Sequence, residues 1–121
     1  MSMDFTKALG VHPDALKLRA ERTKILASNI ANENTPGFQA RDIDFTATLR
    51  QTQADETGGL ALDTGSADPM YRLPYHAAQD GNTVELGVEQ AEFAQNAADF
   101  QTSLTFLGMK FRGLAKAING Q

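Results

Sequence analysis

The most reactive side chains in this sequence are two histidines and a few closely spaced aspartates. His12 stands before a proline and His76 stands in a polar stretch, and neither has partners at the spacing of a metal site. Asp42 and Asp44 are two residues apart beside Arg41, a pattern that suits acid–base work. An exposed extended segment gives no reason for shifted pKa values, however. We therefore expect these aspartates to cap a turn or to form a local salt bridge.

The remaining signatures of chemistry do not appear. Asp63 and Asp68 lack the glycine and the bidentate glutamate of a calcium loop. Neither a phosphate-binding loop nor a nucleophile elbow is present. The 121 residues include no cysteine, which excludes disulfides and thiolate metal sites. The sequence predicts that the protein is not an enzyme and uses no cofactor or metal.

Length and charge further narrow the classes of protein to which this chain can belong. A chain of 121 residues makes one domain, or one hairpin-like unit with an insertion. The net charge of -4 argues against nucleic acid as a partner. No apolar run approaches the roughly 20 residues that a membrane span needs, and no cleavable secretory signal is visible at the N-terminus.

Residues 13–34 are predicted to form the N-terminal helix. Pro13 suits the first turn and Asp14 suits the positive end of the helix dipole. Pro36 and Gly37 then stop the helix. A thin stripe of apolar and small residues alternates in steps of four and three: Leu16, Ala20, Thr23, Ala27 and Ile30.

Residues 83–121 are predicted to form the C-terminal helix. Asn82 is a suitable N-cap, with Glu85 three residues later in a capping-box arrangement. The same four-three rhythm continues through Gln90 and along a richer stripe: Leu86, Phe93, Ala97, Phe100, Leu104, Leu107, Phe111, Leu114 and Ile118. The first half of this helix is acidic and its last turns are basic.

The two stripes predict that residues 13–34 and 83–118 pack as one antiparallel coiled-coil domain. A register that sets Ile30 against Leu86 also sets Leu16 against Phe100, and it lays the basic N-terminal helix along the acidic half of its partner. One thin helix cannot cover the longer stripe. We therefore expect the two stripes to form an assembly surface that also packs on neighbouring subunits.

The rest of the chain is predicted to be irregular. Residues 1–12 form a short leader, and residues 35–82 form a joint followed by an outward-facing middle segment. Two glycine-containing polar stretches in that segment have neither helical nor alternating periodicity. Six apolar or aromatic residues are expected to form short strands or to anchor the loop: Leu60, Leu62, Met70, Tyr71, Leu73 and Tyr75. The predicted fold class is mainly α, with an irregular or short-β middle segment.

One long motif resembles the signature of bacterial flagellar basal-body rod and hook proteins. Its first part is Leu26, Ala27, Ser28, Asn29, Ile30, Ala31, Asn32, Asn34, Thr35, Pro36, Gly37 and Phe38. Its continuation, Ala40, Arg41, Asp42, Ile43, Asp44 and Phe45, is similar to the FlgB branch, which forms the proximal rod. The resemblance covers roughly residues 14–50 and 80–118.

This resemblance implies a structural subunit of the proximal rod, part of the hollow drive shaft that transmits torque and leaves an export channel. The implied partners are other copies of the chain, other rod proteins, the adaptor between ring and rod, and the type III export gate. The implied location is the periplasmic rod, reached without a cleaved signal peptide. Export substrates of this kind carry an early Phe-x-x-x-aliphatic element, and Phe5 and Leu9 fit it.

Two alternatives stay open at this point. Another rod subunit shares the first part of the motif, although the continuation and the short chain favour the proximal one. A protein of a different class, a soluble helical-hairpin adaptor or chaperone, would bind a partner helix along the stripe of residues 86–118. Presence in purified basal bodies distinguishes a rod subunit from a chaperone.

Overall fold

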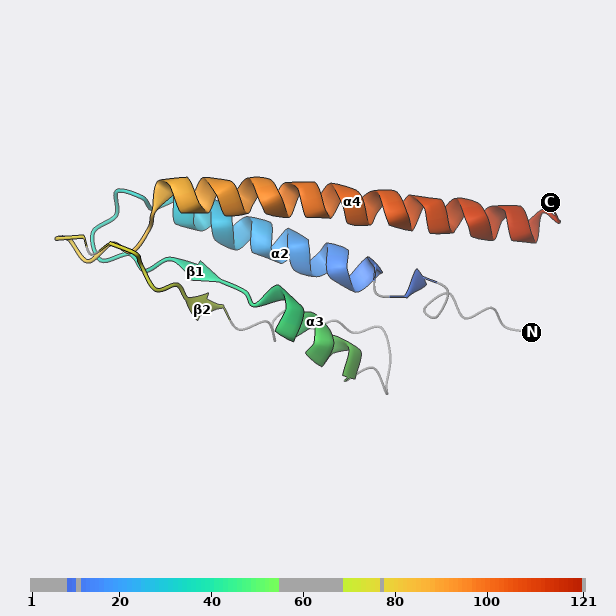
Figure 1. Cartoon of the computed structure of the whole chain (residues 1–121), viewed down its shortest axis with the longest axis horizontal. Helices are drawn as coiled ribbons and strands as arrows, with labels where there is room; N and C mark the ends of the chain where they lie inside the picture. Colours follow the sequence, from blue (N-terminus) through green and yellow to red (C-terminus); the bar gives the residue numbers. More distant parts are fainter. Residues whose placement is uncertain (1–8, 11, 55–68, 77, 121) are drawn as a thin grey trace.

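The two long helices of the chain lie side by side and run in opposite directions (Figure 1). The computed structural model describes residues 9–10, 12–54, 69–76 and 78–120. In chain order the elements are α2 (His12–Ala31), β1 (Arg41–Asp42), α3 (Phe45–Ala54), β2 (Met70–Tyr71) and α4 (Leu86–Ile118). The chain is therefore mainly helical, and a small sheet and a short helix lie on the side of α2 away from α4 in Figure 1.

Local chemistry accounts for both ends of α2. Pro13 lies in the first turn, where its missing N–H leaves no gap in the helix, and Asp14 follows it. The helix ends at Ala31 rather than near residue 34, and residues 32–37 form a turn. Gly37 has a φ of 72°, a left-handed conformation that glycine adopts at little cost. The turn directs the chain away from α4 and into β1.

The expected capping box at the start of α4 is wrong. The N-cap is Glu85, without a side-chain cap, and the helix begins at Leu86 rather than near residue 83. The Asn82 amide nitrogen instead donates to the carbonyls of three residues after α2, at 2.8–2.9 Å: Asn32, Glu33 and Thr35. Asn82 is 6% exposed. The Asn82 side chain therefore fastens the turn after α2 to the start of α4 instead of capping α4.

The middle segment is more regular than expected. Strands β1 and β2 pair antiparallel, with Arg41 opposite Tyr71. Helix α3 was not predicted, because its β-branched threonines lower the helix propensity of this stretch. The Asp44 carboxylate accepts the Ala47 N–H at 3.1 Å and so caps this helix, in agreement with the capping role expected for it. Ile43, just before the cap, is 5% exposed and so belongs to the buried core.

The buried side of α2 differs from the expected stripe. Ala20 and Ala27 are exposed, whereas Leu18 and Leu26 are buried. The other stripe members are half-buried: Leu16, Thr23 and Ile30. The packed side of α2 thus holds two leucines where the stripe placed two alanines, and larger apolar side chains gain more from burial.

The side-chain contacts between α2 and α4 lie close to the expected register. The residue numbers of Asn29–Glu89 and of Arg19–Asp99 each add up to 118, whereas those of Arg22–Glu92 add up to 114. The expected pairing of Ile30 with Leu86 adds up to 116, which lies between these values. Polar side chains occupy the contact: Asn29, Glu89 and Asn96 are each at most 1% exposed. Hydrogen bonds and ion pairs therefore contribute to this helix contact beside the half-buried apolar side chains.

Candidate functional site

The residues with the most reactive chemistry do not form a catalytic arrangement in the described part of the chain. The His12 ring stacks on Phe106 with 5.9 Å between centroids, and His76 contributes only its backbone N–H, to Glu85. Asp63 and Asp68 lie outside the described residues. Within the described ranges, no cluster of three or more histidine, aspartate or glutamate side chains is placed to hold a metal ion.

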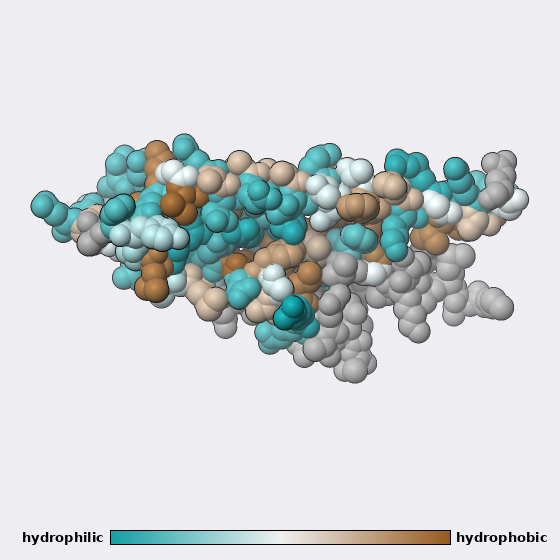
Figure 2. All heavy atoms as spheres, viewed as in Figure 1, coloured by the Kyte–Doolittle hydropathy of each residue, from teal (hydrophilic) through white to brown (hydrophobic). Residues whose placement is uncertain are grey.

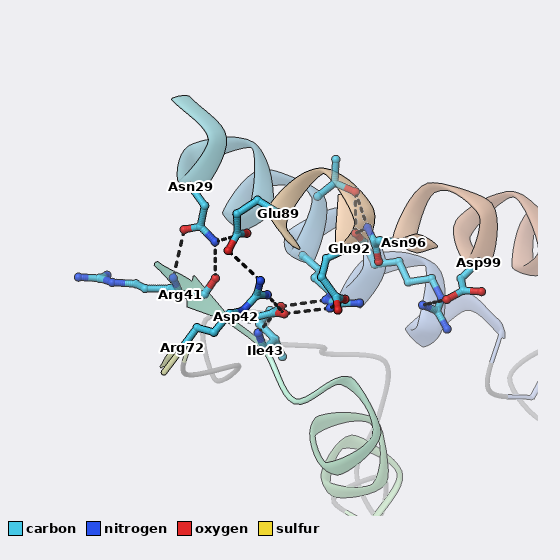
Figure 3. A network of polar contacts seen from close by, with 12 residues as sticks. Asn29, Arg41, Asp42, Ile43, Arg72, Glu89, Glu92, Asn96 and Asp99 are labelled. Carbon is cyan, nitrogen blue, oxygen red and sulfur yellow. Dashed lines mark hydrogen bonds and ion pairs between the residues drawn. The ribbon is translucent and has the colours of Figure 1, made fainter. Parts of the chain in front are cut away.

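Asp42 is the centre of an ion-pair network that joins distant parts of the chain (Figure 3). Arg22 of α2 binds it through two nitrogens, Nε at 2.8 Å and Nη2 at 2.9 Å. Arg72, just after β2, binds the same carboxylate through its own Nη2. The fork geometry of Arg22 is the strongest arrangement that an arginine and a carboxylate form. The local salt bridge expected for Asp42 is therefore wrong, because its partners are 20 and 30 residues away.

The environment also shifts the pKa of Asp42, contrary to the expectation of an ordinary value. Burial by itself raises the pKa, but the Arg22 hydrogen bond, the Ile43 N–H and the charge of Arg72 outweigh it and leave the pKa lowered. The hydrogen bond that Arg22 donates to Asp42 in turn raises the pKa of Arg22. The pair is charged at neutral pH and holds α2 to β1.

Glu89 brings α4 into the same network. This carboxylate is 0% exposed, and it accepts a hydrogen bond from Arg72 Nη1 at 2.7 Å and from the Asn29 amide at 2.9 Å. Burial raises its pKa, an effect that these two partners only partly offset. One turn further along, Glu92 pairs with Arg22 at 2.6 Å. The network thus connects α2, β1, the end of β2 and the start of α4.

Asn29 acts as a substitute for a neighbouring strand. Its amide nitrogen donates to the Arg41 carbonyl at 2.7 Å, and its amide oxygen accepts the Arg41 N–H at 3.1 Å (Figure 3). Arg41 pairs with Tyr71 of β2 on its other side. The asparagine therefore occupies one edge of the two-stranded sheet and fixes that sheet to the helix pair.

A second polar cluster lies further along the helix pair. Arg19 pairs with Asp99 at 3.3 Å, and its guanidinium carbon lies 3.9 Å from the centre of the Phe45 ring of α3. Burial lowers the pKa of Arg19, and the charge of Asp99 opposes this effect. The Asn96 amide donates to the Arg19 carbonyl at 3.0 Å and to the Thr23 hydroxyl at 2.8 Å.

These contacts confirm one expectation about charge. The basic residues of α2 lie along the acidic first half of α4, as the Arg19–Asp99 and Arg22–Glu92 pairs show. The sequence did not single out Arg72 or Glu89 as functional residues. The only available signal was a glutamate inside an otherwise amphipathic helix, and that signal is weak because most such glutamates are solvated.

The family motif forms the joint between α2 and β1. Its buried members are Leu26, Asn29, Ala40 and Ile43, and its half-buried members are Ile30, Asn32, Phe38, Asp42 and Phe45. Its exposed members are Ala27, Ser28, Ala31, Asn34, Thr35, Pro36, Gly37, Arg41 and Asp44. The motif therefore combines a structural core with a solvent-facing surface at one end of the molecule.

The predicted stripe of α4 is only partly covered within the chain. Its half-buried members are Leu86, Phe93, Phe100, Leu107 and Leu114. Leu104 is 44% exposed, Phe111 is 50% exposed and Ile118 is 62% exposed, while Ala97 is also exposed. Figure 2 shows hydrophobic side chains at the surface along the C-terminal half of α4. The described residues therefore leave several large apolar side chains of α4 open to solvent.

Two expectations concern the ends of the chain and the membrane. Leu9 is half-buried, and its expected export partner Phe5 lies outside the described residues. Among the described residues, no helix combines the length and the apolar character that crossing a membrane requires.

Comparison with known proteins identifies relatives over nearly the whole chain. The sequence model of the family described as "Flagella basal body rod protein" matches residues 9–39. "Flagellar basal body rod protein FlgB" of Aeromonas hydrophila is 40% identical over 131 aligned positions, covering 100% of this chain and 99% of the relative. The protein of that name from Cereibacter sphaeroides strain ATH 2.4.9 is 46% identical, and the alignment covers 97% of this chain and 98% of the relative. The protein of that name from Salmonella typhimurium is 41% identical, and the alignment covers 93% of this chain and 94% of the relative.

Proposed function

Because this chain belongs to the FlgB family of flagellar basal body rod proteins, we propose that it assembles into the proximal rod through the open face of α4. The chain is a structural subunit of the flagellar basal body rod. The observation that carries this function is the similarity to relatives of one name across nearly the full length of both chains. Its part in the rod is mechanical and requires no catalytic centre.

The two long helices supply the packing unit of this assembly. In the rod, α2 and α4 form an antiparallel coiled coil whose outer stripe packs on the helices of adjacent subunits. Two observations support this arrangement: the helices are antiparallel within the chain, and Leu104, Phe111 and Ile118 lie open in the C-terminal half of α4. Packed in this way, helices transmit torque between subunits and surround a channel for later export substrates.

The partners follow from the same position. Other copies of the chain and other rod proteins contact the stripe, and the adaptor between ring and rod lies at the proximal end. The chain reaches the periplasm through the type III export gate without a cleaved signal, and Phe5 and Leu9 form the element that the gate reads. The resemblance of the leader to that of rod and hook substrates supports this route.

The test places a charge on the open stripe. Leu104→Asp puts a carboxylate where an adjacent subunit packs, and an unpaired buried charge is costly enough to break the contact. We expect the variant to be exported at normal levels but to be absent from purified basal bodies, in cells that lack hooks and do not swim. Thr102→Asp is the matched control, because Thr102 is exposed about 160° around the same helix. Motile Leu104→Asp cells with complete basal bodies would contradict the proposal.

A further inference from the structure

A pocket of about 330 Å³ opens beside the joint, between α2 and the chain that leads into β1. The residues that form it are Lys24, Ile25, Ser28, Phe38, Arg41 and Pro69, together with Asn29 beneath them. This volume is at the lower end of the range of about 300–1,000 Å³ for ligand pockets. Side chains of a partner protein fit a pocket of this size better than a large cofactor does.

The pocket combines cations with apolar walls. Ile25 and Phe38 are half-buried, whereas Lys24 and Arg41 are exposed at its rim. Among the described residues that line the pocket, none is acidic. Lys24 pairs with Glu21 at 3.1 Å, but its side chain is 75% exposed, and a surface pair of this kind contributes little. The local charge therefore favours an incoming carboxylate.

Arg41 is held in place without a carboxylate of its own. Its backbone is fixed by Asn29, its guanidinium lies 5.1 Å from the centre of the Tyr71 ring, and Nη2 donates to the Tyr71 hydroxyl at 3.3 Å. Within the described ranges, Arg41 has no acidic partner, in contrast to Arg19 and Arg22. A positioned guanidinium with free N–H groups loses little freedom when a carboxylate binds it.

The chain itself offers a matching carboxylate at the same end. In the described part, Glu33 and Asp14 are the acidic side chains for which no hydrogen bond or ion pair is found. Glu33 is exposed and lies two residues beyond the end of α2, whereas Asp14 is half-buried at the opposite end of that helix. Ser28 of the pocket lies in the last turn of α2. When two copies stand side by side at the same level, Glu33 of one copy and the pocket of the other therefore lie at the same height along the helices.

We propose that this pocket receives Glu33 of an adjacent copy of the chain, with Arg41 and Lys24 binding the carboxylate. This inference rests on the proposed function, because it requires copies side by side in the rod. A contact between two different patches of the same chain repeats around an axis and produces a ring or a helix rather than a closed pair. That geometry suits a tubular assembly. The α4 stripe then supplies apolar area, and this contact fixes the angular position of each copy.

Charge reversal tests the pairing in cells. Arg41→Glu and Glu33→Arg each place like charges together, and we expect each to reduce spreading in soft agar at least tenfold while export and helical content stay normal. The double variant restores the opposite charges, so it should recover at least half of the wild-type spreading. Glu33→Arg combined with Arg50→Glu is the matched control, because Arg50 is exposed on α3, and it should not recover.

Cysteine cross-linking tests the contact directly, because the natural chain contains no cysteine. Cells would produce one chain with Glu33→Cys and a second with Ser28→Cys, so that any disulfide joins two molecules. The periplasm permits disulfides, and we expect cross-linked dimers in purified basal bodies. Asp14→Cys with Ser28→Cys is the control and should give none.

The outcomes separate this inference from the rod function itself. Wild-type motility of both single reversals, or absence of cross-links in basal bodies that contain the chain, would overturn the Glu33 contact alone. Rescue of Arg41→Glu by Asp14→Arg, or by a reversal in a different rod protein, would also overturn it. Absence of the wild-type chain from basal bodies would instead overturn the rod function.

Discussion

Nη1 of Arg72 lies 2.7 Å from Oε1 of Glu89, a carboxylate that solvent does not reach, and Nη2 of the same guanidinium binds Asp42. One arginine from the middle segment therefore neutralises two acids that belong to different elements. The middle segment is attached to the helix pair by charge as well as by the small sheet. Four predictions follow from this attachment, from the joint and from the leader.

Arg72→Met should destabilise the fold strongly. The substitution keeps most of the side-chain volume but leaves Glu89 buried with only Asn29 as a partner, and it removes one of two arginines from Asp42. Loss of one partner of a buried pair costs about 3–5 kcal/mol, and we expect the lower end because Arg72 and Asp42 are 19% and 20% exposed. Urea unfolding followed by circular dichroism measures the change, with the exposed Arg50→Met as control. Equal midpoints for the two variants would contradict the role of Arg72.

Stability should depend on pH through two carboxylates whose pKa values are shifted in opposite directions in the folded chain. The raised pKa of Glu89 means that its charge opposes folding, so this stability is present below pH ~4.3 and is lost as pH rises through the folded pKa. The lowered pKa of Asp42 means that its stability is present above pH ~3.9 and is lost as pH falls further. In Glu89→Gln, the free energy of unfolding should therefore no longer fall as pH rises above ~4.3. In Asp42→Asn, it should no longer fall as pH drops below ~3.9. Unfolding midpoints of both variants between pH 3 and pH 7 test these assignments.

Asn82→Ala should weaken the joint. The substitution removes the amide donor from the carbonyls of Asn32, Glu33 and Thr35. The Asn32 and Thr35 carbonyls keep the N–H groups of Thr35 and Phe38, so the Glu33 carbonyl is the one most affected. An unsatisfied polar group costs about 1–3 kcal/mol when buried, and we expect the lower end because Glu33 is exposed. We expect faster hydrogen exchange in the last turn of α2 and in the turn that follows it, measured by mass spectrometry. Asn34→Ala is the control, because Asn34 is an exposed member of the same turn. Unchanged exchange in the Asn82 variant would show that water replaces the amide.

Replacement of Phe5 and Leu9 with alanine should retain the chain inside the cell at normal levels of synthesis. The two residues form the Phe-x-x-x-aliphatic element expected in the leader. Immunoblots of the periplasm and of the cell interior measure the distribution. Thr6→Ala and Lys7→Ala lie between the two positions and serve as controls that should be exported. Normal export of the Phe5/Leu9 variant would show that the export gate does not read these two residues, and their role would then be in packing.

The sequence by itself determined the helical character of the chain and its family. The four-three spacing identifies two long helices, because each helix must bury one side and successive turns repeat that side. The sequence Thr35-Pro36-Gly37 identifies the end of the first helix. Proline fixes its own φ and lacks an N–H, and glycine adopts backbone conformations that other residues avoid, so both act locally. Such signals depend on residues within a turn or two of each other. For the same reason, the charge complementarity of α2 and α4 was predictable from the order of charges along each helix.

Only the tertiary structure decided which residues form the centre of the joint. The partners of Asp42 are 20 and 30 residues away, and Asn29 bonds to Glu89 from 60 residues away. Periodicity ranks side chains by hydropathy, so it assigned Ala20 and Ala27 to the packed side and left polar residues in solvent. A buried asparagine or glutamate is stable only when its partners converge on it from other elements. That convergence is a property of the folded chain, which is why the ion-pair network could not be obtained from spacing.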